Sequence, residues 1–120
     1  MAEFLERLDR VYCLCIESRK AFVIEHFRQL GMLHKLEIVT AYTPNSPIVE
    51  QLLEKQLIYP VYTKNPTTIA CGMGVRYIMQ QIVEKGYKHA MVMEDDVIFP
   101  EELFPVANEW ICPEMINRNF

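Results

Sequence analysis

The sequence predicts an α/β fold in which helices cover a mainly parallel sheet. Residues 11–16 are six consecutive apolar residues without polar alternation, which is typical of a strand buried on both faces. Two further short strands are indicated at 36–41 and 88–93. Helical patterns lie between these strands, and such an alternating order favours parallel pairing through right-handed crossover connections.

The first helix is expected between Ser18 and Gly31. Ser18 is of a residue type that caps helix N-termini. Val23, Phe27 and Leu30 recur at the spacing of one helix face. Gly31 can adopt the left-handed backbone conformation with which helices often end.

One weak and one strong helix are predicted between the second and third strands. A turn is expected at 45–47, a modest helix at 48–57, and a loop or short extended piece at 59–65. The strong helix starts at Pro66, whose missing N–H is not needed at the first helical position, and Asn65 can cap it. Its apolar residues form a single stripe: Cys71, Val75, Ile78, Met79 and Ile82.

The third strand runs directly into three adjacent acids. Gly86 ends the preceding helix, and strand 88–93 is followed by Glu94-Asp95-Asp96. A second apolar run lies at 97–99, and 100–102 is typical of another helix start. Because both apolar runs favour burial, the carboxylates between them are drawn toward a region of low dielectric. Water at the sheet edge, basic side chains or a bound cation must compensate for their charge.

The acidic triplet has two interpretations. In an extended chain, Glu94 and Asp96 point to one side and Asp95 to the other. Carboxylates at this spacing can bind one Mg²⁺ or Mn²⁺ ion through oxygen. They would lie just past the carboxyl end of a strand, where open α/β sheets bind ligands. In the alternative, the triplet is an acidic turn in which a carboxylate caps the next helix.

Composition and charge exclude several classes of protein. The 120 residues correspond to a single domain, 1–120, and 51% hydrophobic with 23% charged residues excludes a disordered or collagen-like chain. The net charge of −4 and the lack of a basic run argue against nucleic-acid binding. With no apolar stretch near the roughly 20 residues of a membrane span and no signal-peptide core, we expect a cytoplasmic protein without a transmembrane segment. The four cysteines form no C-x-x-C pair, and we expect reduced thiols.

Four segments, in order, resemble motifs of glycosyltransferase family 25, the lipopolysaccharide-type and procollagen-type galactosyltransferases. Residues 11–19 resemble the family's first strand and arginine-containing turn, and residues 36–41 resemble its second strand. Residues 70–75 stand where the family has the helix start Cys-x-x-Ser-His. Residues 93–97, Met-Glu-Asp-Asp-Val, closely match the acidic motif Leu-Glu-Asp-Asp-Val. The resemblance extends over roughly residues 10–110, with one sharp motif and three loose ones.

The resemblance implies the donor-binding half of a GT-A fold, a Rossmann-like sheet that binds a nucleotide-sugar. It implies transfer of a hexose, galactose in this family, from a UDP-sugar to a hydroxyl of a glycan or protein. Glu94 and Asp96 would hold Mn²⁺ or Mg²⁺ against the diphosphate, where the ion offsets charge on the leaving group. Asp95, Arg19 and Glu17 would contribute to donor binding; the alternative for Arg19 is a solvated charge at the start of a helix.

The chain departs from the family pattern in two ways. Gly74 and Val75 occupy the positions of the Ser-His pair, so both of those side chains are missing. The chain also stops at Phe120, whereas the family's catalytic region usually continues, and no general base for the acceptor hydroxyl can be identified. One alternative is therefore a shortened, non-catalytic nucleotide-sugar-binding or assembly protein. Another is an ordinary α/β domain with an acidic cap. We expect apolar surface on the shortened sheet to favour a homo-oligomer.

Overall fold

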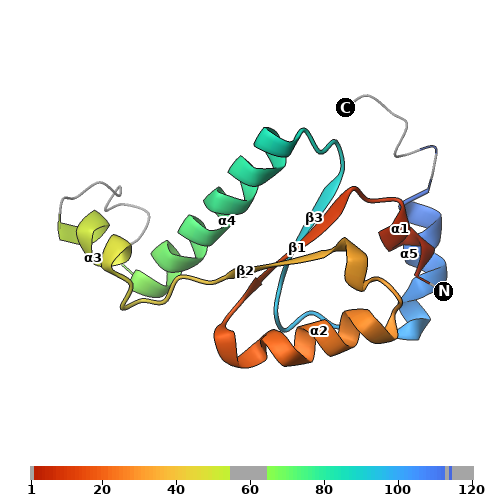
Figure 1. Ribbon diagram of the computed structural model, residues 1–120, viewed down its shortest axis with the longest axis horizontal. Coiled ribbons are helices and arrows are strands. Elements are labelled where there is room, and N and C mark those ends of the chain that lie inside the picture. The colour runs from red at the N-terminus through yellow and green to blue at the C-terminus, as the bar shows by residue number, and fades with distance from the viewer. Residues whose placement is uncertain (1, 55–64, 113, 115–120) are drawn as a thin grey trace.

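Helices pack on both faces of a parallel sheet, as the sequence predicts. The computed structural model describes residues 2–54, 65–112 and 114. Helix α4 (Pro66–Lys85) lies on one face of the sheet and helix α2 (Lys20–Gln29) on the other (Figure 1). The α/β class is therefore confirmed.

Strand β1 (Arg10–Cys15) is the central strand of a three-stranded sheet. It pairs in parallel with β2 (Leu36–Thr40) on one side and with β3 (Ala90–Glu94) on the other, giving the order β2-β1-β3. Residues 11–15 are all buried. Residues 11–15 of the apolar run thus form a strand covered on both faces, as predicted, whereas Ile16 lies past its end and is 46% exposed.

The two faces of β1 contribute to two different cores. Val11, Cys13 and Cys15 belong to the core on the side of α2, which also contains Phe27. Tyr12 and Leu14 pack on the other side, with Ile78 of α4 and partly buried neighbours. Because successive side chains of a strand point to opposite faces, one short strand holds both helix layers to the sheet.

The chain enters α2 differently from the prediction. Ser18 lies inside a 3₁₀ turn, Glu17–Arg19, which closes through a hydrogen bond of 3.0 Å from the Arg19 N–H to the Ile16 carbonyl. Arg19, not Ser18, stands at the N-cap of α2, and no side chain caps the helix. The expected Ser18 cap is wrong because the chain already turns helically before α2 begins. Gly31 has φ +70°, which confirms the left-handed exit.

The long helix α4 has the predicted boundaries. The Asn65 side chain accepts a hydrogen bond of 2.9 Å from the Thr67 N–H, and Gly86 at the other end has φ +70°. Helix α3 spans Pro47–Glu54. Residues 55–57 of the helix predicted there, and residues 59–64 of the predicted loop, lie outside the described residues.

Strand β3 begins two residues later than the predicted strand. The N–H groups of Lys88 and His89 both donate to Oδ2 of Asp9, over 2.8 and 3.0 Å. This carboxylate holds the two residues in a loop beside the start of β1. The hydrogen bonds also lower the pKa of Asp9, chiefly through the His89 N–H.

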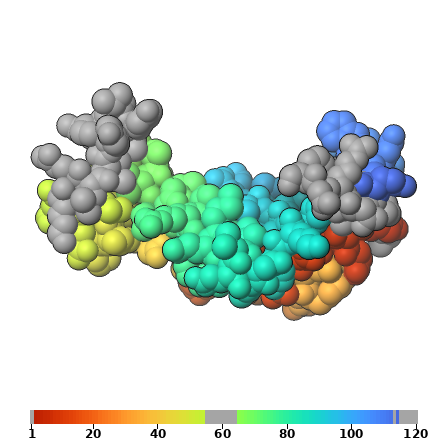
Figure 2. All heavy atoms as spheres, turned by 90° about the horizontal axis from the view of Figure 1, so that it is seen from above, coloured from red at the N-terminus to blue at the C-terminus, as the bar shows by residue number. Residues whose placement is uncertain are grey.

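The two ends of the described chain meet beside the sheet. Helix α1 (Glu3–Glu6) packs against α5 (Phe104–Trp110), and the Phe4 N–H donates to Oδ1 of Asn108 over 2.8 Å. A short 3₁₀ helix, Glu101–Leu103, leads into α5, and another, Leu33–Lys35, precedes β2. Seen from above, α4 crosses the middle of the molecule, with α3 and α5 at opposite ends (Figure 2). Among the described residues no helix is long and apolar enough to span a membrane.

Candidate functional site

The acidic triplet lies in a cleft at the carboxyl ends of the three strands. The cleft has a volume of about 190 Å³ and is formed by the exits of β1 and β3, the loop after β2 and the first turns of α4. Parallel sheets bind ligands at this edge. The lining residues are Leu14, Ile16, Ala41, Tyr42, Pro44, Thr67, Ala70, Cys71, Glu94, Asp95 and Asp96.

The triplet forms a turn and not an extended segment. Glu94 is the last residue of β3, and the Val97 N–H donates to the Glu94 carbonyl over 3.3 Å, which closes a turn over Asp95 and Asp96. The alternating orientation predicted for an extended chain therefore stops at Glu94. Glu94 and Asp96 are exposed to water and Asp95 is half-buried. Hydration at the sheet edge compensates for much of their charge.

The helix-cap interpretation of the triplet is wrong. The next helical turn starts at Glu101, its N-cap is Pro100, and no side chain caps it. Helix α5 begins later still and also lacks a side-chain cap. The three acids thus do not satisfy the N–H groups of the following helix. Glu94 and Asp96 thus remain available to a ligand that enters the cleft, whereas Asp95 accepts a hydrogen bond from a backbone N–H.

Asp95 joins the exits of β1 and β3. Its Oδ2 accepts a hydrogen bond of 3.0 Å from the Ile16 N–H, and its carbonyl accepts one of 3.2 Å from Nη2 of Arg19. The Arg19 guanidinium also lies over the ring of Phe22, with 4.5 Å between Cζ and the ring centroid. Arg19 is therefore half-buried and held against the triplet, rather than a freely solvated charge.

Glu17 is placed apart from the other predicted site residues. Its carboxylate pairs with Nζ of Lys20 at 2.8 Å, and its side chain is 79% exposed. It does not line the acidic cleft. The structure thus brings Glu94, Asp95 and Asp96 together in the cleft. It attaches Arg19 to Asp95 from outside the cleft lining and leaves Glu17 on the surface.

The thiols near the cleft are protonated at neutral pH. Burial, followed by the nearby Glu94 carboxylate, raises the pKa of Cys71, whose Sγ lies 3.7 Å from Oε1 of Glu94. Burial raises the pKa of Cys13 to about 12, with Cys15 and Asp95 adding to the effect. Burial and Asp95 also raise the pKa of Cys15. None of these thiols is activated as a nucleophile, since activation requires a lowered pKa. All four cysteines are free, as predicted.

The carboxylate oxygens in the cleft suit a hard divalent ion whose remaining ligands are water and substrate phosphates. Within residues 2–54, 65–112 and 114, no group of three or more His, Cys, Asp and Glu side chains is placed to hold a metal. Glu94 and Asp96 offer two exposed carboxylates, while Asp95 is engaged by Ile16. Mg²⁺ is commonly held by one or two carboxylates and completed by water and substrate phosphates. The residues fit such a shared site and do not form a closed structural one.

Sequence reasoning missed Tyr42 and the role of Gly74. Tyr42 follows β2 and lines the cleft; the rule that parallel strands end at one edge could have indicated it. Gly74 is buried where α4 crosses β1, and a Cβ atom built there would lie 2.5 Å from Cδ1 of Leu14. The absence of a side chain at this position thus reflects close packing of helix on strand.

The fold and the site define an α/β domain with an acidic cleft at the carboxyl edge of a parallel sheet. No family model matches the chain, and no curated protein or solved structure matches it either. The likeness to glycosyltransferase family 25 therefore rests on the four sequence motifs.

Proposed function

We propose that this chain binds a UDP-sugar through a divalent ion in the acidic cleft and transfers its hexose, galactose by the family likeness, to a hydroxyl of a glycan or protein. One observation carries the proposal. The triplet of Glu94, Asp95 and Asp96 lines a cleft at the carboxyl edge of the sheet and caps no helix. Carboxylates at this place suit an ion that holds a diphosphate.

Each residue of the triplet would have its own role. Glu94 and Asp96 would hold Mg²⁺ or Mn²⁺, and the bound ion would offset charge on the departing diphosphate. Asp95 fixes the exit of β3 against that of β1 through the Ile16 N–H. Arg19 uses Nη2 to hold the Asp95 carbonyl, and a guanidinium has five N–H donors. Arg19 does not itself line the cleft, so it would act on the donor by holding Asp95.

The second candidate function is nucleotide-sugar binding without catalysis, and Gly74 favours it. The family likeness places a Ser-His pair at Gly74 and Val75, and this chain has neither side chain. Any side chain at Gly74 must displace Leu14, since its Cβ would lie 2.5 Å from Cδ1 of that residue. If the pair supports turnover in the family, a protein with this packing would bind the donor and release no sugar.

Calorimetric titration of Mn²⁺, with and without UDP, tests donor binding. We expect Mn²⁺ to bind more tightly when UDP is present, because the diphosphate completes the ion's ligands. Asp96→Asn should abolish this gain. Glu102→Gln removes the same charge from an exposed position outside the cleft, and this control should retain it.

Release of UDP from UDP-galactose, with water or an added hydroxyl compound taking the galactosyl group, then separates the candidates. Release that depends on Asp96 supports the transferase. Tighter Mn²⁺ binding with UDP but no release supports the binding protein. If UDP leaves Mn²⁺ binding unchanged in the unmodified chain, both candidates fail and the chain is an α/β domain with another role.

A further inference from the structure

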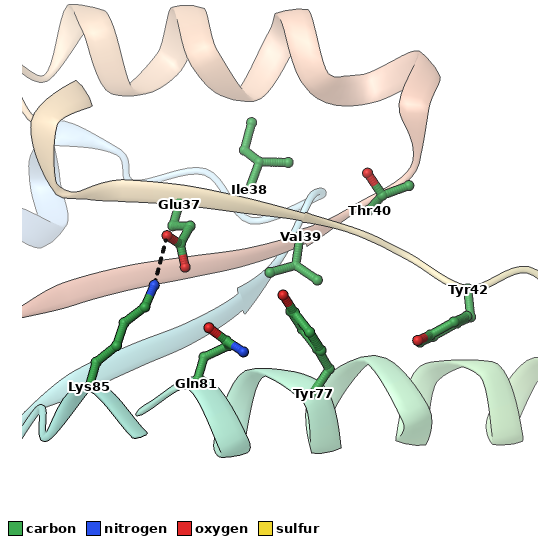
Figure 3. Close-up of a pocket in the computed structure, with 8 residues that line it drawn as sticks. All are labelled: Glu37, Ile38, Val39, Thr40, Tyr42, Tyr77, Gln81 and Lys85. Carbon is green, nitrogen blue, oxygen red and sulfur yellow. Dashed lines mark hydrogen bonds and ion pairs between the residues drawn. The ribbon is translucent and has the colours of Figure 1, made fainter. Parts of the chain in front are cut away.

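A second cavity runs along the outer edge of β2, apart from the triplet. Its volume is about 440 Å³. Four consecutive β2 residues, 37–40, form one side, and α4 forms the other (Figure 3). Glu37 and Val39 point toward α4, whereas Ile38 and Thr40 point away from it (Figure 3). The cavity is thus a groove between a strand edge and a helix, and we call it the β2–α4 groove.

The strand side of the groove is an open edge. In the part of the chain that the structure describes, β2 pairs with β1 alone. Its outer edge therefore presents backbone N–H and C=O groups that no described strand pairs with, and such an edge is a template for another strand. Natural edges are often protected by lysine or proline. The sequence of β2, Leu-Glu-Ile-Val-Thr, has neither.

The helix side of the groove presents a row of adaptable side chains. Tyr77, Gln81 and Lys85 are spaced four residues apart, so they lie on one face of α4. Tyr77 is 43% exposed, and Tyr42, which closes the groove at the carboxyl end of β2, is 38% exposed. Half-exposed tyrosines and an amide provide apolar contact together with hydrogen bonding. This combination suits the side chains of an extended peptide.

The amino-terminal end of β2 carries an excess of positive charge. The Glu37 carboxylate is shared by Nζ of Lys85 at 3.3 Å and Nη2 of Arg10 at 3.7 Å. Two cations thus face one anion; Lys85 lines the groove, and Arg10 approaches Glu37 from outside its lining. In an antiparallel arrangement, the carboxyl end of an added strand meets the amino-terminal end of β2. The charge therefore favours a partner whose carboxyl end is acidic.

We propose that the β2–α4 groove binds an extended peptide as an added antiparallel strand, with the peptide's acidic carboxyl end beside Lys85 and Arg10. Backbone hydrogen bonds to β2 would supply affinity, and contacts with Tyr77 and Gln81 would supply specificity. The inference does not rest on the proposed transferase function. Among the described residues, Tyr42 alone lines both the groove and the acidic cleft, so the variants tested do not change it.

Amide chemical-shift titration of the ¹⁵N-labelled chain tests the proposal with two synthetic peptides. The first is acetyl-Thr-Val-Thr-Val-Thr-Asp-Glu with a free carboxyl end. The second has proline in place of its second valine, which removes an N–H and disfavours strand pairing. We expect saturable shifts at residues 37–40 and at the Gln81 side-chain amide with the first peptide only.

Variants locate the peptide within the groove. Tyr77→Ala should weaken binding at least fivefold. Met79→Ala truncates another exposed side chain of α4, 53% exposed and outside the groove, and should leave the affinity unchanged. Lys85→Glu should weaken binding of the acidic peptide about tenfold. It should improve binding of a peptide amide that ends in Lys-Lys, because the charge at that end of the groove is reversed.

Several results would overturn the proposal. Shifts that do not saturate, that match those of the proline peptide, or that occur only around the acidic triplet would exclude strand addition at β2. Shifts at residues 37–40 that arise on raising the protein concentration without peptide would assign the edge to a second copy instead. Loss of Mn²⁺ and UDP binding would leave the groove result unaffected, so the two proposals fail separately.

Discussion

Replacing Gly74 by alanine tests how closely α4 packs on β1. The added methyl group would lie 2.5 Å from Cδ1 and 3.0 Å from Cδ2 of Leu14. Gly72 lies in the same helix, and a Cβ atom there meets nothing within 4 Å. Gly72→Ala is therefore a matched control that makes the same chemical change without the contact.

The expected magnitudes follow from two opposing terms. Gly→Ala inside a helix stabilises by about 1 kcal/mol, and overpacking a core costs about 1 to 3 kcal/mol. Leu14 lines both the acidic cleft and an apolar cavity of about 500 Å³ beside β3, so its side chain can shift. We therefore expect the lower part of the overpacking range. Gly72→Ala should raise the free energy of unfolding by about 1 kcal/mol, and Gly74→Ala should lie about 1 to 2 kcal/mol below it.

Urea unfolding of both variants measures this difference, because the helix propensity term cancels between them. Repeating Gly74→Ala in a Leu14→Ala background should remove the penalty, since the contacting methyl groups are then absent. Equal stabilisation by Gly72→Ala and Gly74→Ala would refute the close packing. Close packing of α4 on β1 would then no longer explain why residue 74 lacks a side chain.

Three further predictions concern buried or engaged polar groups. The Tyr12 hydroxyl is buried beside the Glu37 carboxylate but makes no hydrogen bond of normal geometry among the described residues. Tyr12→Phe should therefore raise the free energy of unfolding by about 1 kcal/mol in urea; a loss would show that Glu37 accepts a hydrogen bond from the hydroxyl. Burial lowers the pKa of His26, whose Nε2 accepts a hydrogen bond of 3.1 Å from the Phe99 N–H. The unfolded chain then binds a proton more readily than the folded one, so the free energy of unfolding should fall as the pH drops below about 6.5. His26→Gln should flatten this dependence when unfolding is measured at several pH values. Asp95→Ala leaves the Ile16 N–H without its carboxylate and should lower the midpoint of thermal unfolding through a loss of about 1 kcal/mol; an unchanged midpoint would contradict its role in joining β1 to β3.

The fold could be predicted where local and tertiary preferences agree. The apolar run at 11–16 indicated a strand covered on both sides, and residues 11–15 are buried in one, whereas Ile16 lies past its end. Asn65 with Gly86 marked the ends of α4 because both act locally. The Ser18 cap was wrong because the 3₁₀ turn Glu17–Arg19 already begins after Ile16, before α2. The start of β3 was set too early because the carboxylate of Asp9, about 80 residues away in the sequence, holds Lys88 and His89 in a loop. A local pattern does not contain such a contact.

The location of the candidate site could be predicted from the sequence, but the arrangement of its side chains could not. Three acids at the end of a parallel strand indicated the carboxyl edge of the sheet, and the cleft lies there. The predicted orientation of their side chains was wrong because a turn begins at Glu94. The hydrogen bond from Arg19 to Asp95 joins the turn after β1 to the turn after β3, and only the three-dimensional structure shows it. The metal, the donor and the chemistry stay predictions until they are measured.

The pairing of α1 with α5 bears on how the chain folds during synthesis. Phe4 and Leu5 are fully covered in the folded protein, and Asn108, which accepts the Phe4 N–H, lies about a hundred residues further on. At roughly 5 to 20 residues per second, a ribosome adds Asn108 about 5 to 20 seconds after Phe4, so the apolar residues of α1 stay uncovered for that time. Nascent chains should accordingly be most prone to aggregation or chaperone binding in this interval. Burial of α1 against α5 should be among the last steps of folding.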